Sequence, residues 1–296
     1  MSDQADSLRQ LVRQTVKAHP ALEPGVPMWV LSGGKSGVGT STVALQLALE
    51  LAGLGKRAVL IDASPSQPDL TSRLCTKQTG SLRDVLSGER SVVEVLTPIS
   101  ERVRLLPGCW DADSPPELHR RAIKRLIGEI RRLHAHADVV LLDAGHGMSP
   151  WVQWLWKAAQ QILLVTTTEP TTITESYATI KLAPWGDVDN KLRLVVNRVQ
   201  NVAAAEQLSN DFAATCRQFL GIKVRPHATI ARETTSASAP ASPMVGSFDR
   251  AFTQTIRLLA ADLMRSALVM ESPVVHRESK RSAISPLDKK QIQKTI

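Results

Sequence analysis

The sequence predicts an α/β fold, a doubly wound and mostly parallel sheet, with a helical arm in front of it. Three observations support this prediction. Apolar runs typical of buried strands alternate with helical stretches from residue 28 onward. A glycine-rich turn, SGGKSGVGTST at residues 32–42, joins the first run to a helical stretch. Hydrophobic residues make up 43% of the chain, enough for one large core. Alternating strands and helices indicate a parallel sheet covered on both faces.

Four regions are expected, beginning with an amphipathic arm at residues 1–18. Its apolar residues recur at helical spacing: Ala5, Leu8, Val12 and Val16. Three prolines make residues 19–27 a linker. The α/β domain at 28–268 ends in a helix at 248–268, and its expected strands lie at 28–32, 57–62, 103–107, 138–143, 161–167, 192–197 and 221–224. The basic tail at 269–296 is broken by prolines and is expected to be disordered.

The turn at 32–42 has the order of strand, glycine loop and helix that a P-loop requires. Backbone N–H groups of such a loop surround phosphate oxygens, and the N-terminus of the following helix adds a favourable dipole. Gly34, Gly39 and Ser41 match the pattern GxxxxGK[ST], but Thr40 stands where the lysine belongs. The residues expected to contact nucleotide here are Gly34, Lys35, Ser36, Gly37, Val38, Gly39, Thr40, Ser41 and Thr42.

The stretch KSGVGTS at 35–41 resembles the deviant P-loop of MinD/ParA ATPases, usually KGGVGK[ST]. The resemblance implies that Lys35 reaches across an ATP-dependent homodimer to the partner's phosphates. The run RAVLIDAS also resembles this class, because a strand ends in Asp62. Ser64, however, occupies the position of the class's second aspartate, which is thought to orient the attacking water. No intact catalytic residue is therefore expected.

Two later runs follow the same resemblance. DVVLLDAGHG resembles a Walker B strand, which implies that Asp143 holds Mg²⁺ through water while Ser41 binds it directly. LRLVVNRV places Asn197 and Arg198 at the end of a late strand, where relatives use the matching asparagine to bind adenine. The implied cofactors are ATP or ADP with Mg²⁺. Loss of the lysine's charged hydrogen bond costs about 1.5–3 kcal/mol, so we expect weak binding and little or no hydrolysis.

The segment Asp3-Gln4-Ala5-x-x-Leu8-Arg9 matches the DQAxxLR element of FlhG proteins, the MinD-like regulators of flagellar number and placement, also called YlxH or FleN. In that family the arm docks on FlhF, a GTPase of the signal-recognition-particle type, and stimulates its GTP hydrolysis. The resemblance implies that Gln4 helps complete the GTPase site, that Ala5 and Leu8 pack against it, and that Arg9 pairs with acidic or phosphate groups. It also implies flagellar switch and C-ring proteins as partners.

Composition leaves other partners open. The net charge of +8 indicates either an anionic partner or a solvated basic face. A DNA-segregation ATPase of the ParA type would use the basic stretch at 117–133, although we expect an ordinary amphipathic helix there and do not expect DNA as a partner. A third alternative is a nucleotide-free scaffold. Widely spaced cysteines and the absence of a signal-peptide run predict a cytoplasmic protein, with contact at the inner face of the membrane as a further option.

Overall fold

The computed structural model describes residues 25–65, 68–74, 79–108, 120–183, 191–232 and 248–271, with side chains described to residue 267 in the last range. The expected arm, most of the expected linker and nearly all of the expected tail lie outside these ranges. Among the described helices, none combines the length and apolar character needed to cross a bilayer.

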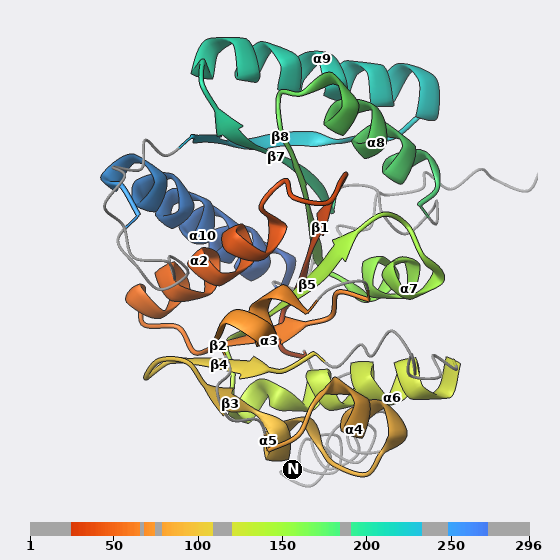
Figure 1. Ribbon diagram of the computed structural model, residues 1–296, viewed down its shortest axis with the longest axis vertical. Helices are drawn as coiled ribbons and strands as arrows, with labels where there is room; N and C mark the ends of the chain where they lie inside the picture. The colour runs from red at the N-terminus through yellow and green to blue at the C-terminus, as the bar shows by residue number, and fades with distance from the viewer. Residues whose placement is uncertain are drawn as a thin grey trace, which may run out of the picture.

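The described residues form one sheet of eight strands in the order β3-β4-β2-β5-β1-β6-β7-β8 (Figure 1). All neighbouring strands are parallel except β3 and β4, which pair antiparallel. The strands are β1 (Met28–Gly33), β2 (Ala58–Asp62), β3 (Thr97–Pro98), β4 (Val103–Leu106), β5 (Val139–His146), β6 (Gln161–Thr166), β7 (Leu192–Val199) and β8 (Arg225–Ala231). This arrangement confirms the predicted doubly wound α/β fold.

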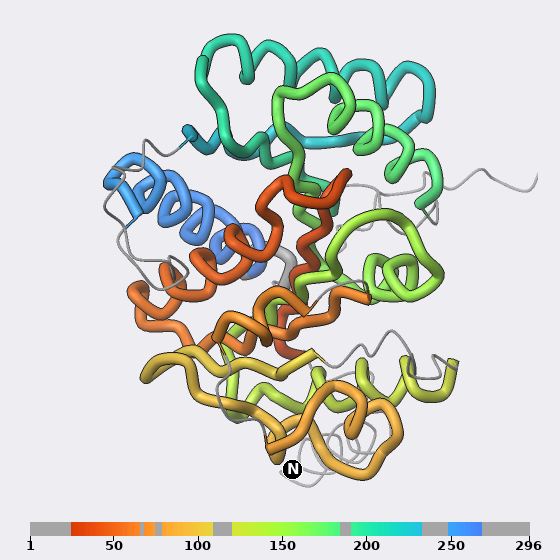
Figure 2. The backbone as a smooth tube through the Cα atoms, in the orientation of Figure 1, coloured from red at the N-terminus to blue at the C-terminus, as the bar shows by residue number. Residues whose placement is uncertain are grey.

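Successive side chains of a strand point to opposite faces, so the strands β1, β2, β4, β5, β6 and β7 each contribute to two apolar cores. On one face Trp29 and Leu31 pack with helices α2 (Thr40–Gly53) and α10 (Arg250–Glu271), which lie side by side (Figure 2). The short helix α3 (Asp69–Leu74) adds Leu70 to the same core.

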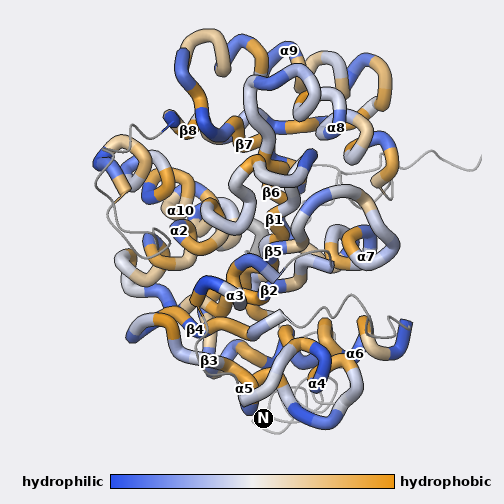
Figure 3. Tube along the Cα trace, viewed as in Figure 1, coloured by the Kyte–Doolittle hydropathy of each residue, from blue (hydrophilic) through white to orange (hydrophobic). Residues whose placement is uncertain are grey.

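The opposite face buries Met28 and Val30 under a larger set of helices. These are α4 (Leu82–Ser87), α5 (Val92–Val95), α6 (Arg120–Arg131), the 3₁₀ turn η1 (Arg132–Ala135), α7 (Pro150–Ala158), α8 (Pro170–Lys181) and α9 (Val202–Leu220). Along outer helices such as α9, apolar and hydrophilic residues alternate (Figure 3), as expected of helices with one buried side. The basic helix α6 behaves in this way, burying Ala122, Leu126 and Ile130 while its arginines lie mainly outside.

The strand predicted at 221–224 is wrong. Gly221 ends α9 with φ of 70°, and the residues after it form a connection until β8 begins at Arg225. The error has a physical cause, because Ile222 and Val224 are buried in the core without joining the ladder, which starts at the pair Arg193–Arg225. The true strand, RPHATIA, lies at the sheet edge and lacks a long apolar run.

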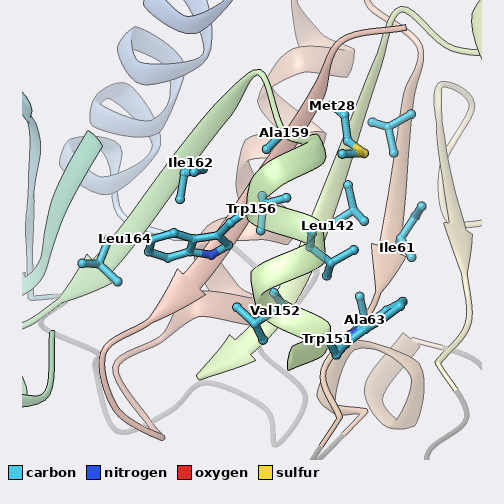
Figure 4. Packing of buried hydrophobic residues seen from close by; sticks show 14 of the residues in the cluster. Met28, Ile61, Ala63, Leu142, Trp151, Val152, Trp156, Ala159, Ile162 and Leu164 are labelled. Carbon is cyan, nitrogen blue, oxygen red and sulfur yellow. The ribbon is translucent and has the colours of Figure 1, made fainter. Parts of the chain in front are cut away.

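Two tryptophans of α7 connect this helix to the strand ends that carry the glycine-rich loop. Trp156 Nε1 donates to Ser32 Oγ at 2.8 Å, and Trp151 Nε1 donates to the Ala63 carbonyl at 2.8 Å. Figure 4 shows Trp156 lying near Leu164 and Trp151 beside Ala63. Both indoles are buried, so they fix the carboxyl ends of β1 and β2 from one side.

Candidate phosphate and metal site

The glycine-rich loop connects the end of β1 to the start of α2 and packs tightly against its neighbours. A Cβ on Gly34 would lie 2.0 Å from Ser176 Oγ and 2.9 Å from Ser176 Cα, both in α8. Gly39, the residue before α2, has φ of 94°, a left-handed conformation that favours glycine. Glycines are therefore required here both by space and by backbone geometry.

Asn197 holds the loop from below. Its buried Nδ2 donates to the Val38 carbonyl at 2.8 Å, and the same amide group lies against Gly39. The next residue, Arg198, has φ of 56° at a break in the register between β7 and β8. A non-glycine residue rarely adopts this left-handed conformation, which is often found at functional sites. The end of β7 therefore supports the loop through Asn197 and leaves Arg198 exposed on the cavity wall.

Two buried carboxylates lie beneath the loop on adjacent strands. Asp62 at the end of β2 pairs in register with Asp143 of β5. Asp62 Oδ2 accepts hydrogen bonds from the Thr71 amide at 2.9 Å and its hydroxyl at 2.7 Å, and Asp143 Oδ1 accepts from the Gly145 amide at 3.1 Å. The other oxygen of each group, Asp62 Oδ1 and Asp143 Oδ2, is buried and accepts no hydrogen bond from the described residues.

The charge state of this pair reflects its burial. Desolvation raises the pKa of Asp62 to about 7, against the hydrogen bonds from Thr71 and with the help of the nearby Asp143 charge. Desolvation likewise raises the pKa of Asp143 to about 6, although a hydrogen bond from Ser41 opposes the shift. Burial therefore disfavours the ionised form of both groups, and a cation bound at their unsatisfied oxygens would favour it, so the site gains from binding one.

The donor set fits Mg²⁺. The ion prefers oxygen ligands, and it is usually held by one or two carboxylates together with water and phosphate oxygens. Ser41 with the free oxygens of Asp62 and Asp143 provides these donors. Within the described ranges no group of three or more His, Cys, Asp or Glu side chains could hold a metal, so a protein-only cage is absent there. A ligand would have to complete the coordination, as a nucleotide phosphate does.

A polar cavity of about 140 Å³ opens above these carboxylates. The structure brings most of the predicted loop residues to its walls, namely Lys35, Ser36, Gly37, Gly39, Thr40, Ser41 and Thr42, joined by Ser64 and Arg198. Gly34, Val38 and Asn197 support the loop instead, and the carboxylates of Asp62 and Asp143 lie below it.

Lys35 extends from the loop toward α8. Its Nζ donates to Thr171 Oγ1 at 3.3 Å and lies 4.0 Å from Glu175 Oε1. Its side chain is 40% exposed, so the ion pair is weak and the amine is free to exchange partners.

Four residues of the cavity wall were not predicted as ligands from the sequence: Asp69, Arg73, Gly145 and His146. Thr71 was also missed; its hydroxyl donates to Asp62 Oδ2 at 2.7 Å and accepts a hydrogen bond from the Gly108 amide at 2.8 Å. No sequence pattern marks the residues of α3, because this helix is only six residues long and its position is set by tertiary contacts. Gly145 and His146, by contrast, follow Asp143 in the run DVVLLDAGHG, which could have indicated them.

Comparison with known proteins agrees with this geometry. The chain is 29% identical over 214 residues to the antiactivator FleN of Pseudomonas aeruginosa, covering 72% of this chain and 75% of FleN. It is 28% identical over 157 residues to the flagellum site-determining protein YlxH of Helicobacter pylori, covering 51% of this chain and 52% of YlxH. These similarities confirm the resemblance to FlhG-like proteins.

A solved structure shares the fold. The septum site-determining protein MinD of Pyrococcus horikoshii, complexed with Mg-ADP, superposes with a TM-score of 0.61 at 19% identity, covering 83% of this chain and 99% of MinD. Residues 29–244 match the family described as the CobQ/CobB/MinD/ParA nucleotide binding domain. The chain, with its glycine loop, paired carboxylates and matching fold, belongs to the CobQ/CobB/MinD/ParA family of nucleotide-binding domains.

Proposed function

We propose that this protein is an FlhG-like regulator of flagellar number or placement that binds Mg-ATP or Mg-ADP weakly and hydrolyses ATP slowly or not at all. The observation that carries the nucleotide part is the cavity between the glycine loop and two buried carboxylates with unsatisfied oxygens. The similarity to FleN and YlxH supports the flagellar part.

Weak hydrolysis follows from two positions at the cavity wall. Thr40 replaces the lysine that neutralises charge on the transferred phosphoryl group, and Ser64 has no carboxylate to orient the attacking water. Binding survives because loop amides, the helix N-terminus and a metal still face the phosphates. Asn197 remains the candidate for the adenine end of the ligand, and Arg198, on the cavity wall, is a further candidate nucleotide contact. Lys35 is proposed to reach the partner's phosphates in an ATP-dependent homodimer, leaving its exposed contacts with α8 to do so.

Isothermal titration of the full chain with Mg-ATP and Mg-ADP, with light scattering alongside, tests the nucleotide part. We expect measurable binding of both, and dimer formation with ATP that Lys35→Ala abolishes. Arg104→Ala, an exposed arginine on β4, is the matched control and should change neither property. Steady-state ATP turnover at the level of intact MinD-type ATPases, lost in Lys35→Ala, would contradict the proposal of slow hydrolysis.

The second part of the proposal concerns the arm. Residues 1–18 stimulate an FlhF-like GTPase of the signal-recognition-particle type, and the body contacts flagellar switch or C-ring proteins and the inner membrane surface. The support is the DQAxxLR element, carried by Asp3, Gln4, Ala5, Leu8 and Arg9. These residues lie outside the described ranges.

GTP hydrolysis by the cognate GTPase, measured with saturating full-length protein, tests the arm. Gln4→Ala should remove the stimulation, whereas Gln10→Ala, on the same arm but outside the element, should retain it. Equal stimulation by both variants would refute the proposed role of Gln4.

The exposed arginines of α6 support a second candidate, a ParA-type function on DNA. Nonspecific DNA binding that weakens steeply between 50 mM and 200 mM salt would favour it, since each neutralised phosphate contributes to that slope. An ordinary amphipathic helix also buries one side and exposes a basic face to solvent, as α6 does, so its arginines do not require DNA. We therefore rank this candidate second.

A further inference from the structure

The phosphate cavity contains more positive charge than the glycine loop supplies. Arg73 of α3 and Arg198 of β7 both line it, together with Lys35. The acidic residue on the wall is Asp69. Lys35 is paired with Glu175, and Asp62 and Asp143 lie beneath the loop, but on the wall itself the two arginines outnumber Asp69, so this part of the wall would be stabilised by an anion.

Arg73 and Arg198 differ from Lys35 in their contacts. Lys35 is engaged by Thr171 and Glu175 of α8. Neither arginine forms a hydrogen bond or ion pair with any residue in the described part of the chain, and both side chains are exposed. Two guanidinium groups that share a cavity and form no ion pair within the described ranges are available for a ligand.

The strand order places the two arginines on opposite sides of the loop. Arg73 follows β2, and Arg198 lies in β7, while the loop follows β1 between them in the order β2-β5-β1-β6-β7. Arg198 is held there by a left-handed backbone at φ of 56°. An elongated anion lying along the loop would therefore meet one guanidinium from each side.

The two arginines lie beside a P-loop that lacks its usual lysine. Thr40 occupies the first residue of α2 and is 7% exposed, so it offers a hydroxyl and no charge to the cavity. Guanidinium groups bind phosphate oxygens in a bidentate manner and keep their charge at any physiological pH. We propose that Arg73, assisted by Arg198, supplies the phosphate-binding charge that the loop lacks at Thr40, so that the cavity takes a polyphosphate chain. This inference rests on the proposed nucleotide function of the same site.

The test measures affinity for two probes, Mg-ATP and inorganic tripolyphosphate, by titration of the full-length protein. Arg73→Ala should weaken both about ten- to a hundred-fold, as expected for loss of a charged hydrogen bond. Arg198→Asn should weaken them less, and asparagine tolerates the left-handed backbone of that position. Arg104→Ala, outside the cavity, should bind both probes like the unaltered protein.

A rescue sharpens the test. If Arg73 stands in for the lysine, Thr40→Lys should restore affinity in the Arg73→Ala background by a larger factor than it raises affinity in the unaltered protein. An equal gain in both backgrounds would overturn the replacement role. Melting of each variant by circular dichroism checks that the exposed α3 site has not unfolded the domain.

The outcomes separate this inference from the proposed function. Arg73→Ala binding both probes normally overturns the inference and leaves nucleotide binding intact. Tripolyphosphate binding without ATP binding overturns the proposed nucleotide function, while a loss in Arg73→Ala still supports the inference. Binding of neither probe by the unaltered protein overturns both.

Discussion

The site has two sides, one formed by carboxylate and hydroxyl oxygens that could hold Mg²⁺ and one formed by the glycine loop that would bind phosphate. They differ in how closely their residues match the MinD/ParA pattern. On the proposed metal side, Ser41, Asp62 and Asp143 supply oxygen donors, and one oxygen of each carboxylate is buried without a hydrogen bond from the described residues. On the phosphate side, Thr40 occupies the position of the P-loop lysine, and Ser64 occupies the position where the MinD/ParA class has its second aspartate. Buried carboxylates with unsatisfied oxygens are expensive unless a cation compensates them, so the proposed metal side would be stabilised by binding one. A site can lose hydrolysis in this way while keeping its ligand.

Removing a metal-side donor should have the largest effect. Asp143→Asn keeps the acceptor for the Gly145 amide but removes the charge, so Mg²⁺-dependent nucleotide affinity should fall by about a hundred-fold or more. Titration with ATP in Mg²⁺ and in EDTA measures it. The Asp138→Asn variant, which alters a half-buried carboxylate paired with Arg57 at 2.8 Å and outside the cavity, serves as control. If the ATP affinity of Asp143→Asn depended on Mg²⁺ as strongly as that of the unaltered protein, Asp143 would not hold the metal and the proposed metal side would be wrong.

The raised pKa values of Asp62 and Asp143 predict that, without Mg²⁺, the free energy of unfolding depends on pH in an unusual way. Because the folded pKa of Asp143 is about 6, above its ordinary 3.8, the folded state holds the proton more tightly than the unfolded state. Its contribution to stability is present below about pH 4 and is lost as pH rises through 6, on the order of 3 kcal/mol. Asp62, with a folded pKa of about 7, acts in the same direction.

His227 opposes this trend, since burial lowers its pKa to about 4 and its contribution to stability is lost as pH falls from 6.5. The quantity to measure is therefore the difference in unfolding free energy between unaltered protein and Asp143→Asn, by urea titration without Mg²⁺. That difference should move in favour of the variant as pH rises from 4 to 7. A difference independent of pH would show that Asp143 is not desolvated.

How far the sequence predicted the site depended on the kind of contact. The glycine loop, Asp62, Asp143 and Asn197 lie at strand ends in local patterns, and the structure gathers them at the carboxyl ends of the interior strands. Arg73 and Thr71 reach the site through a short helix after β2, a tertiary placement without periodicity. The strand at 221–224 failed for the converse reason, because burial without pairing produces the same apolar run as a strand.

The phosphate side can be tested by restoring it. The double variant Thr40→Lys with Ser64→Asp returns the charge and the carboxylate, so ATP turnover should rise about ten- to a hundred-fold over the unaltered chain. Each single variant should gain less, since charge neutralisation and water orientation act on the same step. Phosphate release at saturating Mg-ATP measures the rate. A double variant as slow as the unaltered protein would place the defect elsewhere than at these two positions.

The smallest effect concerns the brace that carries the phosphate side. Asn197→Ala removes the donor to the Val38 carbonyl and should cost about 1–2 kcal/mol of stability. Asn201→Ala is the matched control. It removes the N-cap side chain of α9, which accepts a hydrogen bond from the Ala204 amide at 3.1 Å, and should cost a similar amount of stability. Hydrogen exchange distinguishes them, because only Asn197→Ala should speed exchange at the amides of residues 34–39. Equal exchange there in both variants would mean that the loop is held by α8, through the close contact of Gly34 with Ser176, and not by β7.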